Sequence, residues 1–158
     1  MTDMTFRPAG PGELAAVAEL RWRWMEEMYG PGGAPVEEFV PRFTAWAREN
    51  ERTHRCTVAV RDGRVIGMAW LAVTRRVPHT RAFERASGDL QCVYVTPEER
   101  DRGVGGELID AVLEQARELG IERVVVHSTE RAVAAYARHG FASSHRLLEV
   151  EVPRDGMI

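Results

Sequence analysis

The chain has 158 residues, of which 44% are hydrophobic and 28% charged, a composition typical of a globular domain long enough to bury a core. Its formal net charge of −3 gives no overall electrostatic case for binding nucleic acid. No apolar run approaches the roughly 20 residues that a helix needs to span a bilayer. We therefore expect one domain over residues 1–158, with neither a nucleic-acid nor a membrane partner.

Three further features of the sequence bear on modification, metal binding and localisation. All 21 basic residues are arginine, so no lysine side chain is available for modification. Cys56 and Cys92 lie far apart in the sequence, which predicts buried thiols and no metal site or disulfide framework. The first residues lack the basic and apolar regions of a signal peptide, so we expect a cytoplasmic protein.

The first half of the chain predicts strands and helices with clear boundaries. The expected elements are strand 5–7, a helix from residue 11 to the loop at 30–35, helix 36–50, strand 55–60 and strand 65–73. Pro41 is expected to kink or split the second helix. Asp62-Gly63 is a hairpin signal, and Gly67 indicates a bulge or a close backbone approach in the central strand.

The second half alternates strands with helices. The expected elements are strand 90–95, helix 104–119, strand 122–127, a helix from residue 128 or 129 to about 139, and strand 147–152. An apolar stripe at helical spacing supports the first helix, and alternation of apolar and polar residues supports the final antiparallel strand. Residues 75–88 lack periodicity and are expected to form a loop or a ragged strand end.

The loop at residues 100–106, Arg-Asp-Arg-Gly-Val-Gly-Gly, precedes helix 104–119 and carries the chemistry. A helix begins with about four N–H groups that have no partner inside it, and these lie at the positive end of its dipole. The three glycines leave these amides open to an anion, and the two arginines add forked donors suited to phosphate. The loop therefore predicts a diphosphate site.

Other phosphate motifs fit this loop poorly. A Walker loop needs Lys-Ser/Thr after its glycines, whereas Glu107-Leu108 follows here, and Leu108 also stands where a dinucleotide fingerprint needs its third glycine. The pattern Arg-x-x-Gly-x-Gly after a strand ending in Val-x-Pro instead resembles the acetyl-CoA loop of the GCN5-related N-acetyltransferases (GNAT). The segment Ala-x-x-x-Tyr136-x-x-x-Gly-Phe is similar to a second motif of that family.

The resemblance covers residues 89–141 and implies both a fold and an activity. The implied fold is α+β, in α/β/α layers, with a mixed but mostly antiparallel sheet of about six or seven strands and about four helices. Its two central parallel strands splay apart. The implied reaction transfers an acetyl group from acetyl-CoA to a primary amine of an unidentified small-molecule or peptide acceptor by direct attack.

The family's functional positions map onto residues of this chain. Those implied to bind the coenzyme are Val93, Tyr94, Val95, Arg100, Arg102, Gly103, Val104, Gly105 and Gly106. Tyr136 matches the acid that protonates the departing thiolate. Asp89 aligns with the general base of some members, although it equally fits the end of the preceding loop, and Glu26, Glu27 and His127 are other candidates. Asp101 stands where many members carry glycine.

The acceptor side is implied less closely. The first two helices form one wall of the acceptor site in this family, which makes Trp22, Glu26, Glu27, Tyr29 and Phe39 candidate contacts; core aromatics with solvated carboxylates are the simpler interpretation of each. The alternative function is a sensor or regulatory module that binds CoA or acyl-CoA without significant turnover. The resemblance leaves the oligomeric state open and allows a homodimer.

Overall fold

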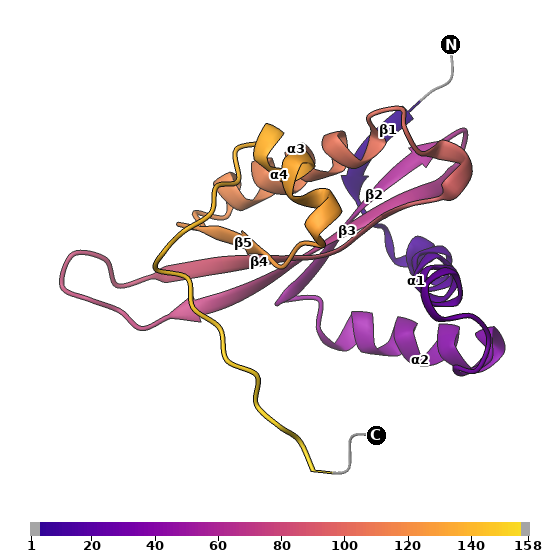
Figure 1. Ribbon diagram of the computed structural model, residues 1–158, viewed down its shortest axis with the longest axis horizontal. Coiled ribbons are helices and arrows are strands. Elements are labelled where there is room, and N and C mark those ends of the chain that lie inside the picture. Colours follow the sequence, from indigo (N-terminus) through magenta and orange to yellow (C-terminus); the bar gives the residue numbers. More distant parts are fainter. Residues whose placement is uncertain (1–3, 156–158) are drawn as a thin grey trace.

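The computed structural model describes residues 4–155, which form one mixed sheet covered by helices on both faces (Figure 1). The elements in chain order are β1 (Met4–Pro8), η1 (Pro11–Glu13), α1 (Leu14–Tyr29), α2 (Val36–Glu49), β2 (His54–Arg61), β3 (Arg64–Arg76), β4 (Arg85–Val95), η2 (Pro97–Glu99), α3 (Val104–Glu118), β5 (Val124–Val126), η3 (Glu130–Ala132) and α4 (Val133–Arg138). No helix within these residues is long and apolar enough to cross a membrane.

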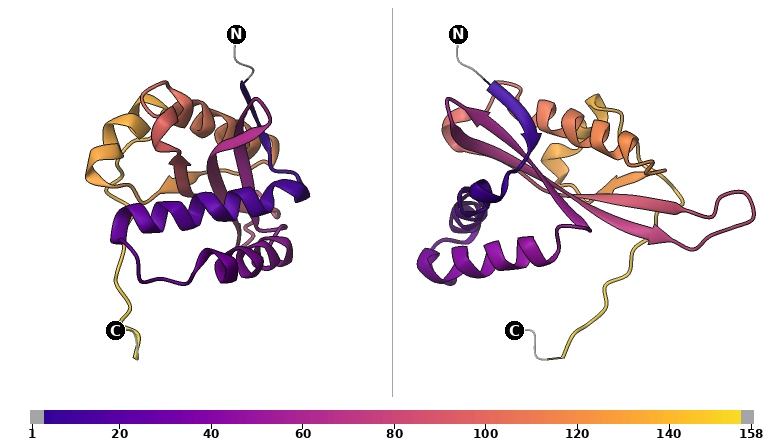
Figure 2. Two further views of the ribbon diagram at one scale, coloured as in Figure 1. Left: turned by 90° about the vertical axis from the view of Figure 1, so that its right-hand side faces the viewer. Right: turned by 180° about the vertical axis from the view of Figure 1, so that it is seen from behind.

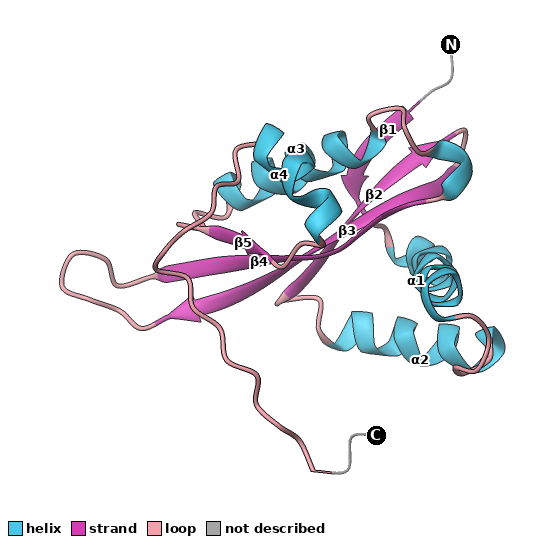
Figure 3. Ribbon diagram, in the orientation of Figure 1, coloured by secondary structure: helices cyan, strands magenta, loops and turns pink. Residues whose placement is uncertain are grey.

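The strands lie in the order β1-β2-β3-β4-β5, and every neighbouring pair is antiparallel except β4 and β5, which are parallel. Helices α1 and α2 cover one face of this sheet, and α3 and α4 cover the other (Figures 1 and 3). The α+β class, the layers and a parallel pair of strands are therefore as predicted, but the pair lies at one edge of the described sheet and not at its centre.

Each face of the sheet has its own apolar core. Between the sheet and α3, the stripe predicted for this helix is buried, with Leu108 and Val112 fully inaccessible. On the opposite face, Val17 of α1 packs in one cluster with Met68 and Trp70 of β3. Because each fully buried aliphatic side chain contributes roughly 1.5–3 kcal/mol, these two layers hold the helices on the sheet.

The structure corrects two of the predicted elements and gives the bounds of a third. The expected strand 147–152 is extended chain without a sheet partner, so the sheet of residues 4–155 has five strands in place of six or seven. Within residues 75–88, β3 ends at Arg76 and β4 begins at Arg85, so residues 77–84 form the expected loop, and the two strands reach it as a two-stranded ribbon beyond the core, where polar side chains suffice (Figure 2). Pro41 lies inside α2, which continues through it without a break.

The parallel pair is short. Only Gly88–Leu90 of β4 pairs with Val124–Val126 of β5, so the last five residues of β4 run on without β5 beside them. A β-bulge follows the point of separation, where Cys92 and Val93 together stand opposite a single residue of β3. Cys92 has a φ of 54°, a conformation in which non-glycine residues are uncommon. The bulge bends β4 away from β5, as bulges generally bend strands.

Gly67 makes the close backbone approach that its place in a central strand predicts. A Cβ atom built on Gly67 would lie 3.1 Å from both the Leu108 Cδ1 atom and the backbone oxygen of Tyr94. The first neighbour is fully buried, and the second belongs to the paired backbone of β4. Neither neighbour can yield without disturbing the packing of α3 on the sheet.

We expect Gly67→Ala to lower the free energy of unfolding by about 1–3 kcal/mol, because overpacking a dense core forces strain into its neighbours. Gly12→Ala is the matched control, since a Cβ there meets nothing within 4 Å. Urea unfolding followed by circular dichroism measures both variants. Equal stability of the two variants would contradict the close approach.

Candidate active site

The loop between β4 and α3 presents a helix start to solvent. Gly103 caps α3 with a φ of 81°, and the N–H of Glu107 donates to the Gly103 carbonyl at 3.1 Å. The N–H groups of the first turn, at residues 104–106, precede this bond and have no intrahelical acceptor. A Cβ on Gly105 would meet only Val95 Cγ2, at 3.9 Å, so the space before these amides is open.

Asp101 adopts a left-handed backbone conformation in this loop, with a φ of 62°. This explains why glycine suits the position, because glycine reaches that region without a steric penalty, whereas aspartate is one of the few other residues that tolerate it. The departure from the family pattern noted in the sequence is therefore accommodated, at the expense of an added negative charge near the helix start.

Gly106 is small for a different reason from its neighbours. A Cβ atom there would lie 2.7 Å from Nε2 of His139, at the end of α4. The other ring nitrogen of His139 lies 2.7 Å from Oδ1 of Asp110 on α3. Gly106 thus allows α4 to sit tightly on the first turns of α3, and the His139–Asp110 contact holds it there.

Arg100 is held in place by three contacts. Its Nε donates to the Val95 carbonyl at 2.9 Å, its Nη2 donates to Glu27 Oε2 at 3.0 Å, and its guanidinium lies 5.3 Å from the centre of the Tyr94 ring. Arg102 is more exposed and lies 3.8 Å from Glu99 Oε1. Both arginines therefore have carboxylate neighbours, so the backbone amides are the uncompensated anion-binding groups of the loop.

Tyr94 and Glu27 form a partly buried anchor between β4 and α1. The Tyr94 hydroxyl donates a short hydrogen bond to Oε1 of Glu27, and its ring stacks on Trp24 with centroids 5.5 Å apart. Burial, followed by this hydrogen bond, raises the pKa of Tyr94 to about 12. Burial acts to raise the pKa of Glu27 as well, but the bonds from Tyr94 and Arg100 outweigh it and hold that pKa below its usual value.

Two glutamates of η2 complete the support of the loop. Glu98 accepts from Arg23 of α1 at 2.9 Å, and Glu99 accepts from Arg61 of β2 at 2.9 Å. The sequence alone did not identify these residues, or Trp24, as part of the site. Partners separated by 38 to 75 positions leave no local pattern by which a single sequence could reveal them.

The unpaired end of β4 carries the residues expected to meet the pantetheine arm. Val93 and Val95 pack toward α3, whereas Tyr94 packs toward α1. Beyond Leu90 the β5 side of this strand has no ladder partner among the described residues, so its backbone groups there are free to pair with a peptide-like ligand.

Tyr136 lies on α4, partly buried, with its ring edge-on to Phe141 at 5.4 Å. Burial raises the pKa of Tyr136, so the phenol is protonated at neutral pH. Its hydroxyl has no hydrogen-bond partner within residues 4–155, which leaves the proton available to a ligand.

Asp89 lies inside β4, paired with Ala72 and Val125, so the alternative that it ends the preceding loop is wrong. Its Oδ2 accepts a hydrogen bond from Gln91 at 2.9 Å. Alternation along β4 places Asp89 on the α1 and α2 face, since Gly88 and Leu90 face α3. His127 follows β5, and its ring is 84% exposed.

The candidate acceptor residues divide into two groups. Trp22, Glu26, Tyr29 and Phe39 line a hollow of about 280 Å³ between α1, the loop after it and α2. Glu27 does not join them, because its carboxylate is turned to Tyr94 and Arg100. The structure therefore does not support the grouping of Glu27 with the other four.

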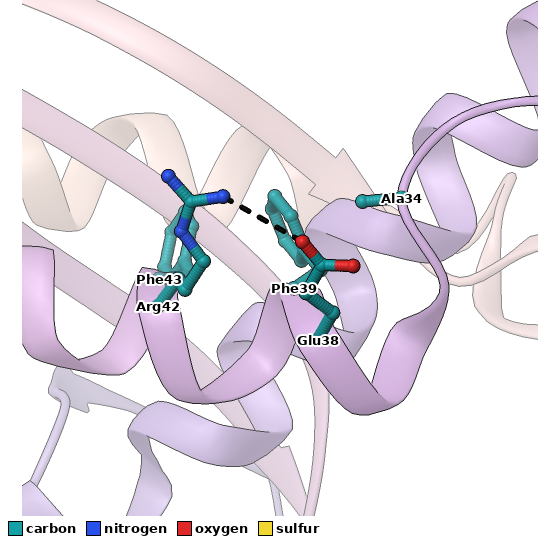
Figure 4. Close-up of a pocket in the computed structure, with 5 residues that line it drawn as sticks. All are labelled: Ala34, Glu38, Phe39, Arg42 and Phe43. Carbon is teal, nitrogen blue, oxygen red and sulfur yellow. Dashed lines mark ion pairs between the residues drawn. The ribbon is translucent and has the colours of Figure 1, made fainter.

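A second hollow, of about 310 Å³, adjoins the first through Ala34 and Phe39. Figure 4 shows it at the start of α2, with the rings of Phe39 and Phe43 set behind an exposed Glu38–Arg42 pair at 3.7 Å. The two hollows together make the end of the α1–α2 layer an indented, partly aromatic surface.

The thiols contribute no nucleophile to this arrangement. Burial raises the pKa of Cys92, with Arg21 nearby acting in the opposite direction, and burial likewise raises the pKa of Cys56. Both side chains are therefore neutral thiols at neutral pH and suit packing better than covalent catalysis.

A glycine-opened helix start beside two parting parallel strands has a shape suited to a diphosphate ligand with a peptide-like arm, as in coenzyme A. A family model described as the acetyltransferase (GNAT) family matches residues 14–141. The chain therefore belongs to the GNAT family, as its motifs predicted.

Comparison with individual proteins supports the same family. The chain is 30% identical over 90 residues to a glucosamine 6-phosphate N-acetyltransferase of Trypanosoma brucei brucei. The aligned region covers 57% of this chain and 59% of that protein. A GCN5-related N-acetyltransferase structure from Ralstonia eutropha superposes with a TM-score of 0.74 and 25% identity, over 98% of this chain and 100% of that one.

A predicted acetyltransferase from Clostridium acetobutylicum, solved with acetyl-CoA, has a TM-score of 0.75 at 16% identity, over 94% of this chain and 96% of that chain. This similarity concerns the fold alone. The curated relatives are longer than the matched region, since this chain covers 17% of one and 59% of the other.

Ultraviolet titration of the tyrosines tests the anchor between β4 and α1. We expect one phenol to ionise only near pH 12, and we expect this phase to disappear in Tyr94→Phe but not in Tyr29→Phe. Because the folded pKa lies above the ordinary value of about 10, the stabilisation from this bond is complete below about pH 10 and is lost as the pH rises toward 12. Retention of the late phase in Tyr94→Phe would contradict the assignment.

Proposed function

We propose that this chain is an N-acetyltransferase that moves an acetyl group from acetyl-CoA to a primary amine of a small molecule or peptide, and that it acts as a homodimer. The observation that carries the proposal is the meeting of two ligand-binding elements: the open first turn of α3 and the unpaired end of β4. One suits a diphosphate and the other suits a peptide-like arm, which together are the two parts of a CoA carrier.

In this proposal the diphosphate binds the first-turn amides, and the arm pairs with residues 93–95. The thioester then lies in the gap between β4 and β5. Tyr136 approaches that gap from the α3 and α4 face, whereas Asp89 belongs to the α1 and α2 face. A donor and an acceptor that enter from opposite faces would therefore meet where the sheet parts.

The proposed reaction needs no covalent enzyme intermediate. The amine nitrogen attacks the thioester carbonyl, the C–S bond breaks, and the amide forms. Tyr136 donates its proton to the leaving thiolate, and Asp89 takes the proton released by the amine. The main contribution of the protein is to hold the two reactants in line.

The proposed acceptor contacts are Trp22, Glu26 and Tyr29 in the hollow beside α2. Two carboxylates, from Glu26 and the neighbouring Glu38, suit an acceptor that carries a positive charge beyond its reacting amine. We propose a positioning role for Glu27, because it fixes Arg100 and Tyr94 at the start of the coenzyme loop.

Titration calorimetry with acetyl-CoA tests the donor site. We expect the wild type to bind and Gly105→Glu to lose binding, because a carboxylate at that position occupies the space before the amides and repels phosphate. A glutamate in the first turn suits the helix dipole, so the variant should remain folded. Gly12→Glu is the matched control and should bind as the wild type does. Absence of wild-type binding would contradict the proposed function.

Thiol release from acetyl-CoA with a panel of primary amines tests turnover. We expect Tyr136→Phe to lower kcat roughly 100-fold with little change in the KM for acetyl-CoA, as loss of a general acid predicts. Because the chain has no lysine, acetylation of the enzyme itself cannot occur at a lysine side chain and confuse the assay. Tight binding without turnover of any amine would favour the sensor module instead.

Asp101 offers a change that should improve the site. We expect Asp101→Gly to tighten acetyl-CoA binding by about 2- to 5-fold, because it removes a negative charge near the diphosphate and the strain of a φ of 62°. Asp101→Asn removes only the charge and should give part of the gain. Weaker binding by both variants would show that the carboxylate supports the loop.

A further inference from the structure

Arg21 stands on the face of α1 that packs against the sheet. It lies one turn beyond Val17 and one turn before Trp24, and both of these side chains pack in the apolar cluster under α1. Spacings of four and three residues put all three side chains on one face of the helix. Arg21 is accordingly partly buried, whereas Arg23 is exposed. Such a stripe normally buries apolar residues, so a charged side chain on it needs an explanation.

Arg21 has no carboxylate partner among residues 4–155. Its guanidinium lies 5.0 Å from the centre of the Trp24 ring, and no acidic side chain of the described chain lies within ion-pair distance of it. Arg23 of the same helix, by contrast, pairs with Glu98 at 2.9 Å. Taking a charge partly out of water without a partner lowers the stability of the fold, so binding of an anionic ligand would explain this arginine.

The neighbours of Arg21 place it beside the point where β4 turns away from β5. The Trp24 ring that it covers stacks on Tyr94 of β4, with centroids 5.5 Å apart. Cys92, the residue at the bulge, packs in the same cluster as Trp24. Burial raises the pKa of the Cys92 thiol, and two charges act on it as well, with Arg21 lowering this pKa and Asp89 raising it. Arg21 and Asp89 therefore lie near the same thiol, one on α1 and the other on β4.

We propose that Arg21 binds a carboxylate of the acceptor, so that the acceptor is a primary amine with a carboxylate close to its nitrogen, as in an amino acid. The inference rests on the proposed acetyl transfer and names its substrate class. Asp89 belongs to the same face of the sheet and carries the opposite charge, so the two side chains complement the ammonium and the carboxylate of such an acceptor. One guanidinium balances the single charge of a carboxylate in a bidentate bond, but it leaves a phosphate only partly balanced.

The two hollows beside α2 would hold the far end of the acceptor. Glu26 lines one of them and Glu38 lines the other, so they suit a cation that is distant from the reacting amine. An acceptor can therefore present its carboxylate to Arg21 and a positive group to the hollows. Within the proposed class, amino acids with a basic side chain would use both surfaces.

Thiol release from acetyl-CoA with matched pairs of amines tests the inference. Each L-amino acid is compared with its own amide, which keeps the amine and the side chain but lacks the carboxylate charge. Because the two differ in amine pKa, kcat/KM is expressed per concentration of unprotonated amine. We expect the wild type to prefer the acids by at least about 10-fold, and Arg21→Met to lower kcat/KM for the acids by about 10- to 100-fold with little change for the amides, as loss of a charge-assisted hydrogen bond predicts.

Two controls separate binding from a structural role. Arg48→Met replaces an exposed arginine in the last turn of α2 and should keep the wild-type preference. Arg21→Met keeps an apolar contact with the Trp24 ring and removes an uncompensated charge. We therefore expect its urea midpoint to be no lower than that of the wild type, and its affinity for acetyl-CoA in calorimetry to be unchanged.

The outcomes distinguish this inference from the proposed function. Equal use of acids and amides by the wild type, or an equal loss for both in Arg21→Met, would overturn the carboxylate site and leave acetyl transfer in place. Acetylation of other primary amines without any turnover of the amino acids would do the same. Absence of turnover with every amine would instead contradict the proposed function, and the inference would fall with it.

Discussion

The parting of β4 from β5 after Leu90 is the constraint on which the rest of the site depends. While the two strands remain paired, their backbone groups satisfy one another and leave nothing for a ligand. Beyond the pair, the bulge at Cys92 turns β4 away and exposes one side of its backbone. The same turn directs the chain into the loop that opens α3, so the proposed sites for the peptide-like arm and for the diphosphate of the coenzyme both follow from one local irregularity.

The charges around the loop show which groups are left to bind an anion. Arg100 is occupied by Glu27 in an exposed pair, and Arg61 by Glu99 in a partly buried one, and these pairs fix the loop against α1 and β2. Side chains so paired add rigidity more than net positive charge. The amides at the start of α3 are fixed dipoles without a counter-charge, and they are therefore the groups best suited to hold the diphosphate of the proposed donor in a chain of net charge −3.

The two faces of the sheet differ in how firmly their candidate functional residues are held in place. On the α3 and α4 side, the Gly106, His139 and Asp110 contacts fix the helix that carries Tyr136. On the α1 and α2 side, aromatic side chains line shallow hollows open to solvent. A site that binds one constant donor and an acceptor peculiar to each family member has reason to be rigid on the first side and variable on the second.

The sequence by itself determined the helix start after β4 and the helical segment that carries Tyr136, because these depend on local rules, whereas the class of the fold came from the resemblance of two motifs to a known family. Apolar residues at helical spacing, glycines at a helix start and a proline after a strand act within a few positions of one another. The same rules placed Gly67 at a close backbone approach. They failed at residues 147–152, because alternation predicts a strand but cannot say whether a neighbour exists.

Only the tertiary structure decided what depends on contacts between distant segments. It showed that Glu27 is bonded to Tyr94, 67 positions away, and does not belong with the candidate acceptor contacts. It also placed Asp89 within a strand. It continued β3 and β4 through residues that have no apolar period, since a ribbon outside the core needs none. Pairings of this kind form when separate elements pack, and no spacing within one segment encodes them.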